Sequence, residues 1–234
     1  MFNRESAGPI TYNLWDGQEK PYAKVSGVEE YEEETWGTRC VYNVTDQTLS
    51  VYPARGQNLG VGVAILPGGA YMAEAIDSEG HDVAKVLSDF GITAAVLKYR
   101  LPNPKTSDQP HMVPLTDTRK ALKLLRQISW QFGFRRDKVG VLGFSAGSHL
   151  ATVTSLWKSD DVEENPSFSG LMYGTTNLSD ENLKWLEDSL YFRKLTPTEI
   201  EQNWLLDLVT PATPPAFLSH AYDDDVCKVE ESTL

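Results

Sequence analysis

The sequence predicts an α/β fold with a mostly parallel sheet and helices on both faces of that sheet. Beyond residue 61, apolar strand-like runs alternate with segments of helical periodicity, and glycines close the helical segments. Such alternation joins parallel strands through helical crossovers, and a sheet built in this way places ligands at the carboxyl ends of its strands. Three motifs rich in glycine, serine or aspartate stand at predicted strand ends, which is where we expect the functional site.

The elements begin with residues 1–37, which are polar and carry an acidic run. We expect an irregular N-terminal extension there, followed by one domain over residues 38–234. Residues 39–45 and 48–54 alternate apolar and polar side chains around a turn, which predicts an antiparallel hairpin. Further strands are expected at residues 61–66, 92–97, 138–142, 168–173 and 216–221.

Helices are expected between these strands. Residues 121–132 repeat apolar side chains at helical spacing, and Gly133 is the expected end of that helix. A capping box at residues 196–199 predicts the start of a later helix. In the segment that ends at Gly91, helical spacing places four apolar side chains on one face: Val83, Val86, Leu87 and Phe90.

The motif G-F-S-A-G at residues 143–147 joins a predicted strand directly to a predicted helix. A sharp strand-turn-helix lifts a serine hydroxyl out of the sheet and aims the helix amino terminus at a developing oxyanion. The alternative is a glycine-bracketed serine in an ordinary tight turn, and the flanking strand and helix disfavour it. Ser145 is therefore the candidate nucleophile.

A second motif, P-G-G-A-Y at residues 67–71, ends a predicted strand. Acyl transfer needs N–H donors where the carbonyl oxygen becomes negative, and glycines let the backbone approach a ligand closely. Read alone, the motif also fits a proline-glycine turn. Its pairing with the serine motif favours an oxyanion hole formed by the N–H groups of Gly69, Ala70 and Ala146.

The third motif, P-P-A-F-L-S-H-A-Y-D-D-D-V at residues 214–226, is a short apolar strand that opens into three aspartates. An acid on such a loop can accept the N–H of an imidazole and fix its tautomer. The order of serine before acid in the chain agrees with one known triad order. Asp224 is the candidate acid, and Asp223 and Asp225 are expected to be solvated.

Together these segments resemble the α/β-hydrolase esterases, and more narrowly the acetylxylan-esterase-like carbohydrate esterases. The resemblance runs from about residue 38 to the end and includes Y-R-L-P at residues 99–102 and P-L-T-D at residues 114–117, in the family's order. It implies an α/β-hydrolase fold and a Ser-His-Asp mechanism. The site residues that it implies are Ser145 as nucleophile, Asp224 as triad acid, and Gly69 with Ala146 as oxyanion donors.

One part of the family pattern is absent. The family's catalytic histidine follows one more strand beyond the acid, and this chain ends at Leu234 before that point. We therefore expect a chain that is truncated before the catalytic histidine and lacks the last strand and helix of the fold. The strand at 216–221 would then be an uncovered edge, which favours self-association through the sheet.

The sequence has four histidines, and none matches the family's base. His149 and His220 match structural positions of the family, and His81 is expected at the surface. His111 remains open as an alternative base. Tyr71 and His111 are the candidates for lining the substrate pocket.

The composition limits the classes of molecule that this chain is expected to bind. A formal net charge of −12 argues against nucleic acid or an anionic membrane and agrees with a neutral substrate. Cys40 and Cys227 are expected to be free thiols, and no zinc spacing or nucleotide-binding motif is present, so we expect no metal and no cofactor. Residues 1–5 do not resemble a signal peptide. The sequence leaves the compartment unknown: secreted or periplasmic if a signal peptide has been removed, and otherwise cytoplasmic.

The predicted activity is that of a carboxylic ester hydrolase. Ser145 would attack a small ester, and the resemblance implies an acetyl group on a polysaccharide such as xylan. Two alternatives remain open: an amidase or exopeptidase on the same fold, and a catalytically silent fragment or carbohydrate-binding scaffold, which the missing histidine favours.

Overall fold

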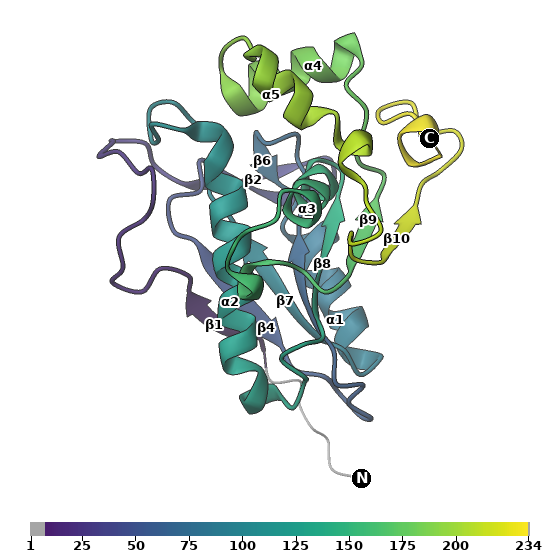
Figure 1. Ribbon diagram of the computed structural model, residues 1–234. Helices are drawn as coiled ribbons and strands as arrows, with labels where there is room; N and C mark the ends of the chain where they lie inside the picture. Colours follow the sequence, from purple (N-terminus) through teal and green to yellow (C-terminus); the bar gives the residue numbers. More distant parts are fainter. Residues whose placement is uncertain (1–7, 234) are drawn as a thin grey trace.

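The computed structural model describes residues 8–233 and is built around one large sheet (Figure 1). This sheet has seven strands in the order β1-β4-β7-β5-β8-β9-β10. The strands from β7 across to β10 run parallel, whereas β1 and β4 pair antiparallel at the other side. The predicted α/β architecture with a mostly parallel sheet is confirmed. The strands span Ile10–Asn13 (β1), Thr48–Tyr52 (β4), Gly62–Leu66 (β5), Thr93–Lys98 (β7), Val139–Phe144 (β8), Ser169–Met172 (β9) and Ala216–Ser219 (β10).

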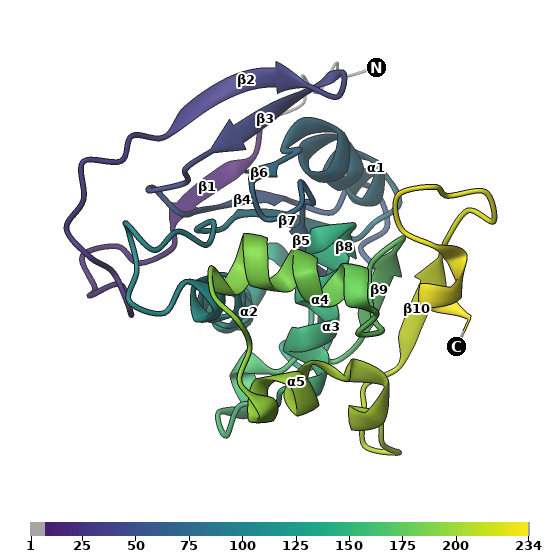
Figure 2. The same cartoon turned by 90° about the horizontal axis from the view of Figure 1, so that it is seen from above.

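Helices cover both faces of this sheet (Figure 2). α2 (Val113–Phe132) and α3 (Ala146–Leu156) pack on one face, and α1 (Asp82–Asp89) packs on the other, against β7. The predicted end of α2 is confirmed, because Gly133 adopts φ +70° and its N–H donates to the carbonyl oxygen of Ser129. Within residues 8–233, no helix combines the length and the apolar character that crossing a lipid bilayer requires.

The predicted apolar face of α1 is only partly buried. Val86 is 54% exposed and Phe90 is 72% exposed, so two of the four side chains that the helical spacing groups together are largely open to solvent. The residues of α1 that are fully buried are Ala84 and Ser88, and the Ser88 hydroxyl donates to the carbonyl oxygen of Pro53 at 2.5 Å. Small side chains let a short helix lie close to the sheet, and helical spacing of large apolar residues does not detect that arrangement.

A second sheet replaces the predicted hairpin. β3 (Thr38–Tyr42) pairs antiparallel with β2 (Tyr31–Thr35) and with β6 (Ala73–Glu74), not with β4 as expected. The two residues between β2 and β3, Trp36 and Gly37, both have positive φ, at 55° and 72°. Positive φ at both positions is the requirement of the tight turn that favours hairpins. The tight turn therefore forms earlier in the chain than the sequence pattern indicated.

The structure also corrects the expected irregular extension over residues 1–37. Residues 1–7 lie outside the described part, but β1 and β2 occur within the rest of this segment. β1 joins the large sheet through β4. On β2, the ring of Tyr31 stacks on the ring of Tyr42 with a centroid separation of 4.9 Å. The segment thus contributes strands to both sheets.

A cap of short helices follows β9. α4 (Asp180–Leu186) and α5 (Pro197–Asn203) lie at the end of the molecule toward which β9 and β10 point (Figure 1). The predicted capping box at the start of α5 is confirmed, since the Thr196 side chain accepts from the N–H of Glu199 and the Glu199 side chain accepts from the N–H of Thr196. The carboxyl ends of the parallel strands therefore face this cap.

The motifs at residues 99–102 and 114–117 meet in a buried ion pair. The carboxylate of Asp117, which has no exposed surface, accepts hydrogen bonds from the Arg100 guanidinium at 2.7 Å, from the backbone N–H of Arg100 and from Trp15 Nε1 at 2.8 Å. Arg100 also donates to the carbonyl oxygen of Pro21. A buried charge that has all its partners is stable in place, whereas losing one partner is costly. These two motifs thus stabilise the core through this ion pair. Their role is structural, not catalytic.

Candidate active site

Ser145 stands at the junction between β8 and α3, where the chain reverses sharply. Its φ of 50° and ψ of −120° form a conformation that non-glycine residues rarely adopt, at a cost of roughly 1–3 kcal/mol. A Cβ on Gly143 would stand 2.1 Å from the carbonyl oxygen of Gly147. A Cβ on Gly147 would stand 2.0 Å from the carbonyl oxygen of Leu66. Only glycine fits at both positions, so the G-x-S-x-G spacing is what permits this turn.

Hydrogen bonds fix the turn to its neighbours on both sides. The backbone N–H of Ser145 donates to the carbonyl oxygen of Met172 at 3.0 Å, which ties it to the end of β9. Its carbonyl oxygen accepts from the N–H groups of Ser148 and His149 in the first turn of α3. The Ser145 side chain is half-buried, so a ligand can still reach the hydroxyl.

The glycine-rich loop after β5 also has an unusual backbone. Gly69 adopts φ 132° and Ala70 adopts φ 55°. The carbonyl oxygen of Gly69 accepts from the N–H groups of Met72 and Ala73, which closes the loop. Within residues 8–233, the N–H groups of Gly69, Ala70 and Ala146 donate to no other group. These three donors are therefore free to bind an incoming oxygen atom.

Glu79 joins the loops that follow β5 and β9, the two strands that flank β8. Its Oε2 accepts from the N–H of Gly68 at 2.7 Å, and its Oε1 accepts from the Tyr173 hydroxyl at 3.1 Å. A Cβ on Gly68 would stand 2.8 Å from both Glu79 Oε2 and the Cβ of Ser145, so this carboxylate lies close to Ser145. Burial raises the pKa of Glu79, and the bond from Gly68 partly opposes that rise.

Sequence reasoning did not single out Glu79 or Tyr173. The two residues are 94 positions apart, and Glu79 is 11 positions from Gly68. Glu79 stands in a polar, acidic stretch that resembles a solvated helix start. Spacing along the chain carries no signal for a contact between loops that only the sheet order brings together.

Asp224 lies in the loop after β10 and is half-buried, whereas Asp223 and Asp225 are exposed. Its Oδ1 accepts from two backbone N–H groups of its own loop, at 2.8 and 2.9 Å. Its Oδ2 is 3.6 Å from His220 Nε2 and accepts no hydrogen bond within residues 8–233. One carboxylate oxygen thus orients the side chain, and the other lies beside the His220 ring without a hydrogen bond from the described residues.

Cys227 connects the Asp224 loop to Ser145. Burial, together with the charge of Asp224, raises the pKa of the Cys227 thiol to about 11, although a hydrogen bond with the Ser145 hydroxyl partly opposes the rise. The pKa of Tyr173 is raised by burial and by the charges of Glu79 and Asp224. The three strand-end segments therefore form one cluster with Ser145 at its centre.

His149 has a structural role beneath this cluster. The Tyr71 hydroxyl shares a 2.9 Å hydrogen bond with His149 Nδ1, and the rings of both residues pack against Trp185. Burial lowers the pKa of His149 to about 4, so the imidazole is neutral at physiological pH. Tyr71 and His149 thereby tie the glycine-rich loop to α3.

The other three imidazoles also have hydrogen-bond or stacking partners, and those of His220 lie in the Asp224 loop and the segment after it. His81, expected at the surface, is half-buried, which corrects that expectation. Among residues 8–233, no group of three or more histidine, cysteine, aspartate or glutamate side chains is arranged to hold a metal ion. The partners are Tyr52 Oη for His81, the stacked ring of Tyr191 for His111, and Ser232 Oγ with the Cys227 carbonyl oxygen for His220.

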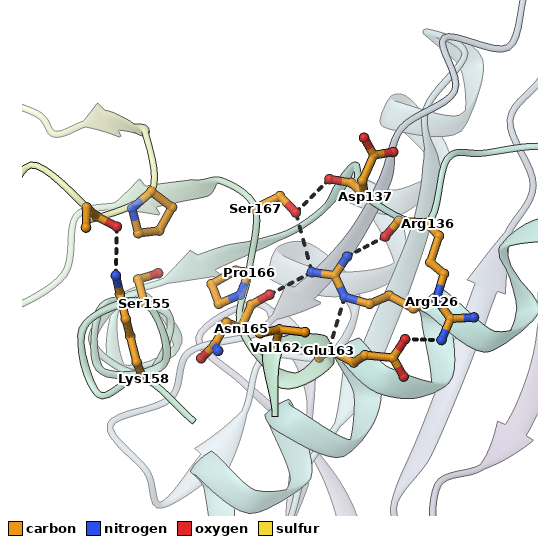
Figure 3. A pocket seen from close by; sticks show the side chains of 12 residues that line it. Arg126, Arg136, Asp137, Ser155, Lys158, Val162, Glu163, Asn165, Pro166 and Ser167 are labelled. Atoms are coloured by element: carbon orange, nitrogen blue, oxygen red, sulfur yellow. Dashed lines mark hydrogen bonds and ion pairs between the residues drawn. The ribbon is translucent and has the colours of Figure 1, made fainter. Parts of the chain in front are cut away.

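A hollow of about 640 Å³ lies near the amino end of β8, at the opposite end of this strand from Ser145 (Figure 3). Its buried Arg126 donates to the carbonyl oxygens of Glu163 at 3.0 Å and Asn165 at 2.6 Å, and Arg136 pairs with the Glu163 carboxylate. Burial lowers the pKa of Arg126. Arg126 thus holds the main chain, and Arg136 is paired with Glu163, so these charged groups have a structural role.

Known proteins share this sequence pattern. Residues 63–229 match the α/β hydrolase fold family. The acetylxylan esterase of Xylanibacter ruminicola is 28% identical over 171 residues, which are 70% of this chain and 34% of that protein. Endo-1,4-beta-xylanase B of Butyrivibrio fibrisolvens is 26% identical over 180 residues, which are 73% of this chain and 28% of that protein. The chain thus spans about a third of the length of these curated relatives.

Solved structures share the fold. An acetyl ester-xyloside bifunctional hydrolase from Caldicellulosiruptor lactoaceticus aligns with a TM-score of 0.76 and 26% identity, over 99% of this chain and 81% of that one. Esterase 2 of Thermogutta terrifontis, in its apo form, aligns with a TM-score of 0.64 and 19% identity, over 92% of this chain and 77% of that one. The region that matches the family, residues 63–229, is most of the chain and holds Gly69, Ser145 and Asp224, and the chain belongs to the α/β hydrolase fold family.

Proposed function

We propose that this chain carries the nucleophile, the oxyanion donors and the triad acid of a serine esterase that acts on small esters. The observation that carries the proposal is the positive φ of Ser145 together with the N–H groups of Gly69 and Ala146, which donate to no other group in the described part of the chain. An ordinary turn gives no reason to hold a serine in a strained conformation next to free donors. An acyl-transfer site needs both features.

In the proposed reaction, the Ser145 oxygen attacks the acyl carbon and the carbonyl oxygen becomes an oxyanion. The N–H groups of Gly69, Ala70 and Ala146 bind that oxyanion, and the amino terminus of α3 adds a favourable dipole. The alcohol leaves, and water then attacks the acyl-enzyme to release the acid. The free Oδ2 of Asp224 is the acceptor for the imidazole that takes the Ser145 proton.

We further propose that this imidazole is none of the four histidines in the sequence. Each of the four is already engaged by another group, the buried His149 by Tyr71, and His220 by Ser232 Oγ and the Cys227 carbonyl oxygen. This observation also favours the second candidate function, a catalytically silent scaffold that binds carbohydrate. The two candidates differ in whether a bound ester is turned over.

The proposed substrate is an acetyl ester on a polysaccharide such as xylan. The acetylxylan esterase that this chain resembles and the acetyl ester-xyloside hydrolase structure support this choice. The net charge of −12 supports a neutral carbohydrate over an acidic one. Aryl amides turned over faster than aryl esters would favour an amidase instead.

The test is 4-nitrophenyl acetate hydrolysis by this chain and by its Ser145→Ala variant, each with and without added imidazole. A chain that lacks its base should be slow alone and should be accelerated by exogenous imidazole only when Ser145 is present. Mass spectrometry should find the acetyl group on the peptide that contains Ser145. If Ser145→Ala hydrolyses the ester as fast as the parent chain under all conditions, the proposal is wrong.

A further inference from the structure

A separate cavity of about 240 Å³ lies beside the end of the glycine-rich loop, where Tyr71 and Met72 line it. Its walls come from segments that follow the carboxyl ends of strands: Tyr71 and Met72 after β5, Asn103 after β7, and Phe192 from the cap after β9. This is the end of an α/β sheet at which ligands bind. The cavity is smaller than the roughly 300–1,000 Å³ of pockets for drug-sized molecules, so it suits a single small ring.

The backbone of this cavity is unusual. Three residues that line it, Asn43, Tyr71 and Phe192, have φ values of 51°, 61° and 56°. Left-handed non-glycine residues are uncommon, and they cluster at ligand sites, where the surrounding structure holds them in place. Three of them from separate segments around one cavity indicate that its shape is maintained at a cost in stability.

The side chains of this cavity combine apolar surface with unused polar groups. The ring of Phe192 is 43% exposed, and Met72 is 59% exposed. Asn103 Oδ1 accepts the N–H of Lys105, but within residues 8–233 its Nδ2 and the Ser189 hydroxyl donate to no other group. A flat apolar surface with hydrogen-bonding groups at its margin matches a sugar ring, which has C–H faces and equatorial hydroxyls.

We propose that this cavity is a carbohydrate subsite that holds one neutral pyranose ring of the acetylated chain, a role that rests on the proposed function for its connection to ester hydrolysis. The ring packs on Phe192, and its hydroxyls bind Asn103 and Ser189. Asp188, which lines the same cavity and pairs with Lys184, accepts a further hydroxyl and repels an acidic sugar. The ligand class is therefore a neutral saccharide.

Tyr71 links the cavity to the segments around the proposed nucleophile. Tyr71 lines the cavity, follows Gly69 and Ala70 in the chain, and bonds through its hydroxyl to His149 on the helix that starts beside Ser145. A sugar ring in the cavity would press on the same loop that offers the oxyanion donors. Binding at this subsite therefore positions the neighbouring acetyl group, which is the effect expected of remote binding contacts.

The test is a titration of the full chain with xylotriose, which carries no ester and so is not turned over. We expect saturable binding by calorimetry, and shifts in amide NMR signals centred on residues 188–192 and 101–106. Phe192→Ala should raise the Kd by about tenfold or more, which is the loss of affinity expected when an aromatic contact is removed. Phe192→Tyr should retain binding. Phe90→Ala, which removes an exposed ring that follows α1 and does not line the cavity, serves as the control and should leave the Kd unchanged.

Asn103→Ala provides a second variant, with an expected loss of several fold, in case Phe192→Ala unfolds the protein. The absence of xylotriose binding to the folded chain, or signal shifts confined to other regions, would overturn the subsite. The experiment distinguishes failure of the subsite from failure of the proposed function. Ester hydrolysis at Ser145 without saccharide binding would rule out only the subsite. Saccharide binding that depends on Phe192, without any ester hydrolysis, defeats only the esterase.

Discussion

Glu231 accepts a hydrogen bond of 2.7 Å from the backbone N–H of Thr176, and this contact fastens the segment after the Asp224 loop to the segment after β9. The same carboxylate accepts from the N–H of Asn177 at 2.8 Å and from Nδ2 of Asn182 at 2.7 Å. Glu231 is buried, although it lies among exposed charged residues. The position of the proposed triad acid thus depends on a carboxylate that does no chemistry.

Glu231→Ala should destabilise the protein by about 1–3 kcal/mol, because it leaves buried donors without an acceptor. Urea unfolding gives the free energy, and limited proteolysis should show faster cleavage of the loop around Asp224. Glu230→Ala, at an exposed neighbouring position, should change stability by less than about 0.5 kcal/mol. Equal effects of the two variants would mean that the carboxylate contacts contribute nothing.

Asp224→Asn should lower kcat by about 10²–10⁴-fold in an active form of the protein, because an amide in place of the carboxylate favours the wrong imidazole tautomer. Asp223→Asn and Asp225→Asn are the matched controls, since both side chains are exposed. Steady-state kinetics with 4-nitrophenyl acetate and circular dichroism of all three variants provide the comparison. A similar loss at all three positions would refute the assignment of Asp224.

Glu74 makes stability depend on pH. This residue of β6 has no exposed surface, its Oε1 accepts the N–H of Tyr99 at 2.7 Å, and its Oε2 has no partner within residues 8–233. Burial raises the pKa of Glu74 well above its ordinary value of 4.5. The unfolded chain therefore ionises at a lower pH than the folded one. The stabilisation is complete below pH 4.5 and is lost as the pH rises through the folded pKa.

Glu74→Gln should flatten this pH dependence, because an amide cannot ionise. The measurement is the urea midpoint of parent and variant across a series of pH values from about 4.5 to 8. Glu79, whose pKa is also raised by burial, should leave a residual slope of the same sign. Parallel curves for parent and variant would show that Glu74 does not titrate differently in the two states.

Cys227 should react slowly with iodoacetamide at neutral pH, because its pKa is about 11 and the thiolate is the reactive form. The rate should rise about tenfold per pH unit between pH 7 and 10. Mass spectrometry of the labelled peptides separates Cys227 from Cys40, which is buried and should react later. Rapid alkylation of Cys227 at pH 7 would contradict the burial that raises its pKa.

The outer strand β10 should promote self-association. Among residues 8–233 it pairs only with β9, and it exposes Phe217 at 64% and Leu218 at 44%. Unpaired backbone groups beside apolar side chains are a template for another strand. Sedimentation velocity should therefore show larger species as the concentration rises, and Phe217→Lys should reduce them. A parent chain that stays monomeric at all concentrations would rule out this edge as a contact.

Local sequence signals were sufficient for the elements that are continuous in the chain. β5 is apolar throughout and buried throughout, as a central parallel strand must be. The glycines of the serine motif were recognised because their spacing is fixed by the turn itself. The same holds for the end of α2, where Gly133 adopts the left-handed conformation that its position requires.

Contacts between distant segments were not predictable in this way. The pairing of β3 depended on the turn at Trp36 and Gly37, where a tryptophan gives no sign of a positive φ. The carboxylates of Glu79 and Glu231 look like solvated charges in the sequence, and only the sheet order brings their partners to them. In both cases one residue's role is decided by a neighbour many positions away.

The buried pair of Arg100 and Asp117 bears on where the smallest folding unit begins. Trp15 and Pro21 supply two of its hydrogen bonds, so the segment after β1 acts as a strap across the core. A shortened version starting at residue 38 would remove both contacts and expose one side of an internal charge to solvent. Residues 14–21 are for this reason part of the hydrolase domain itself, and any redesign of the leading segment has to keep them.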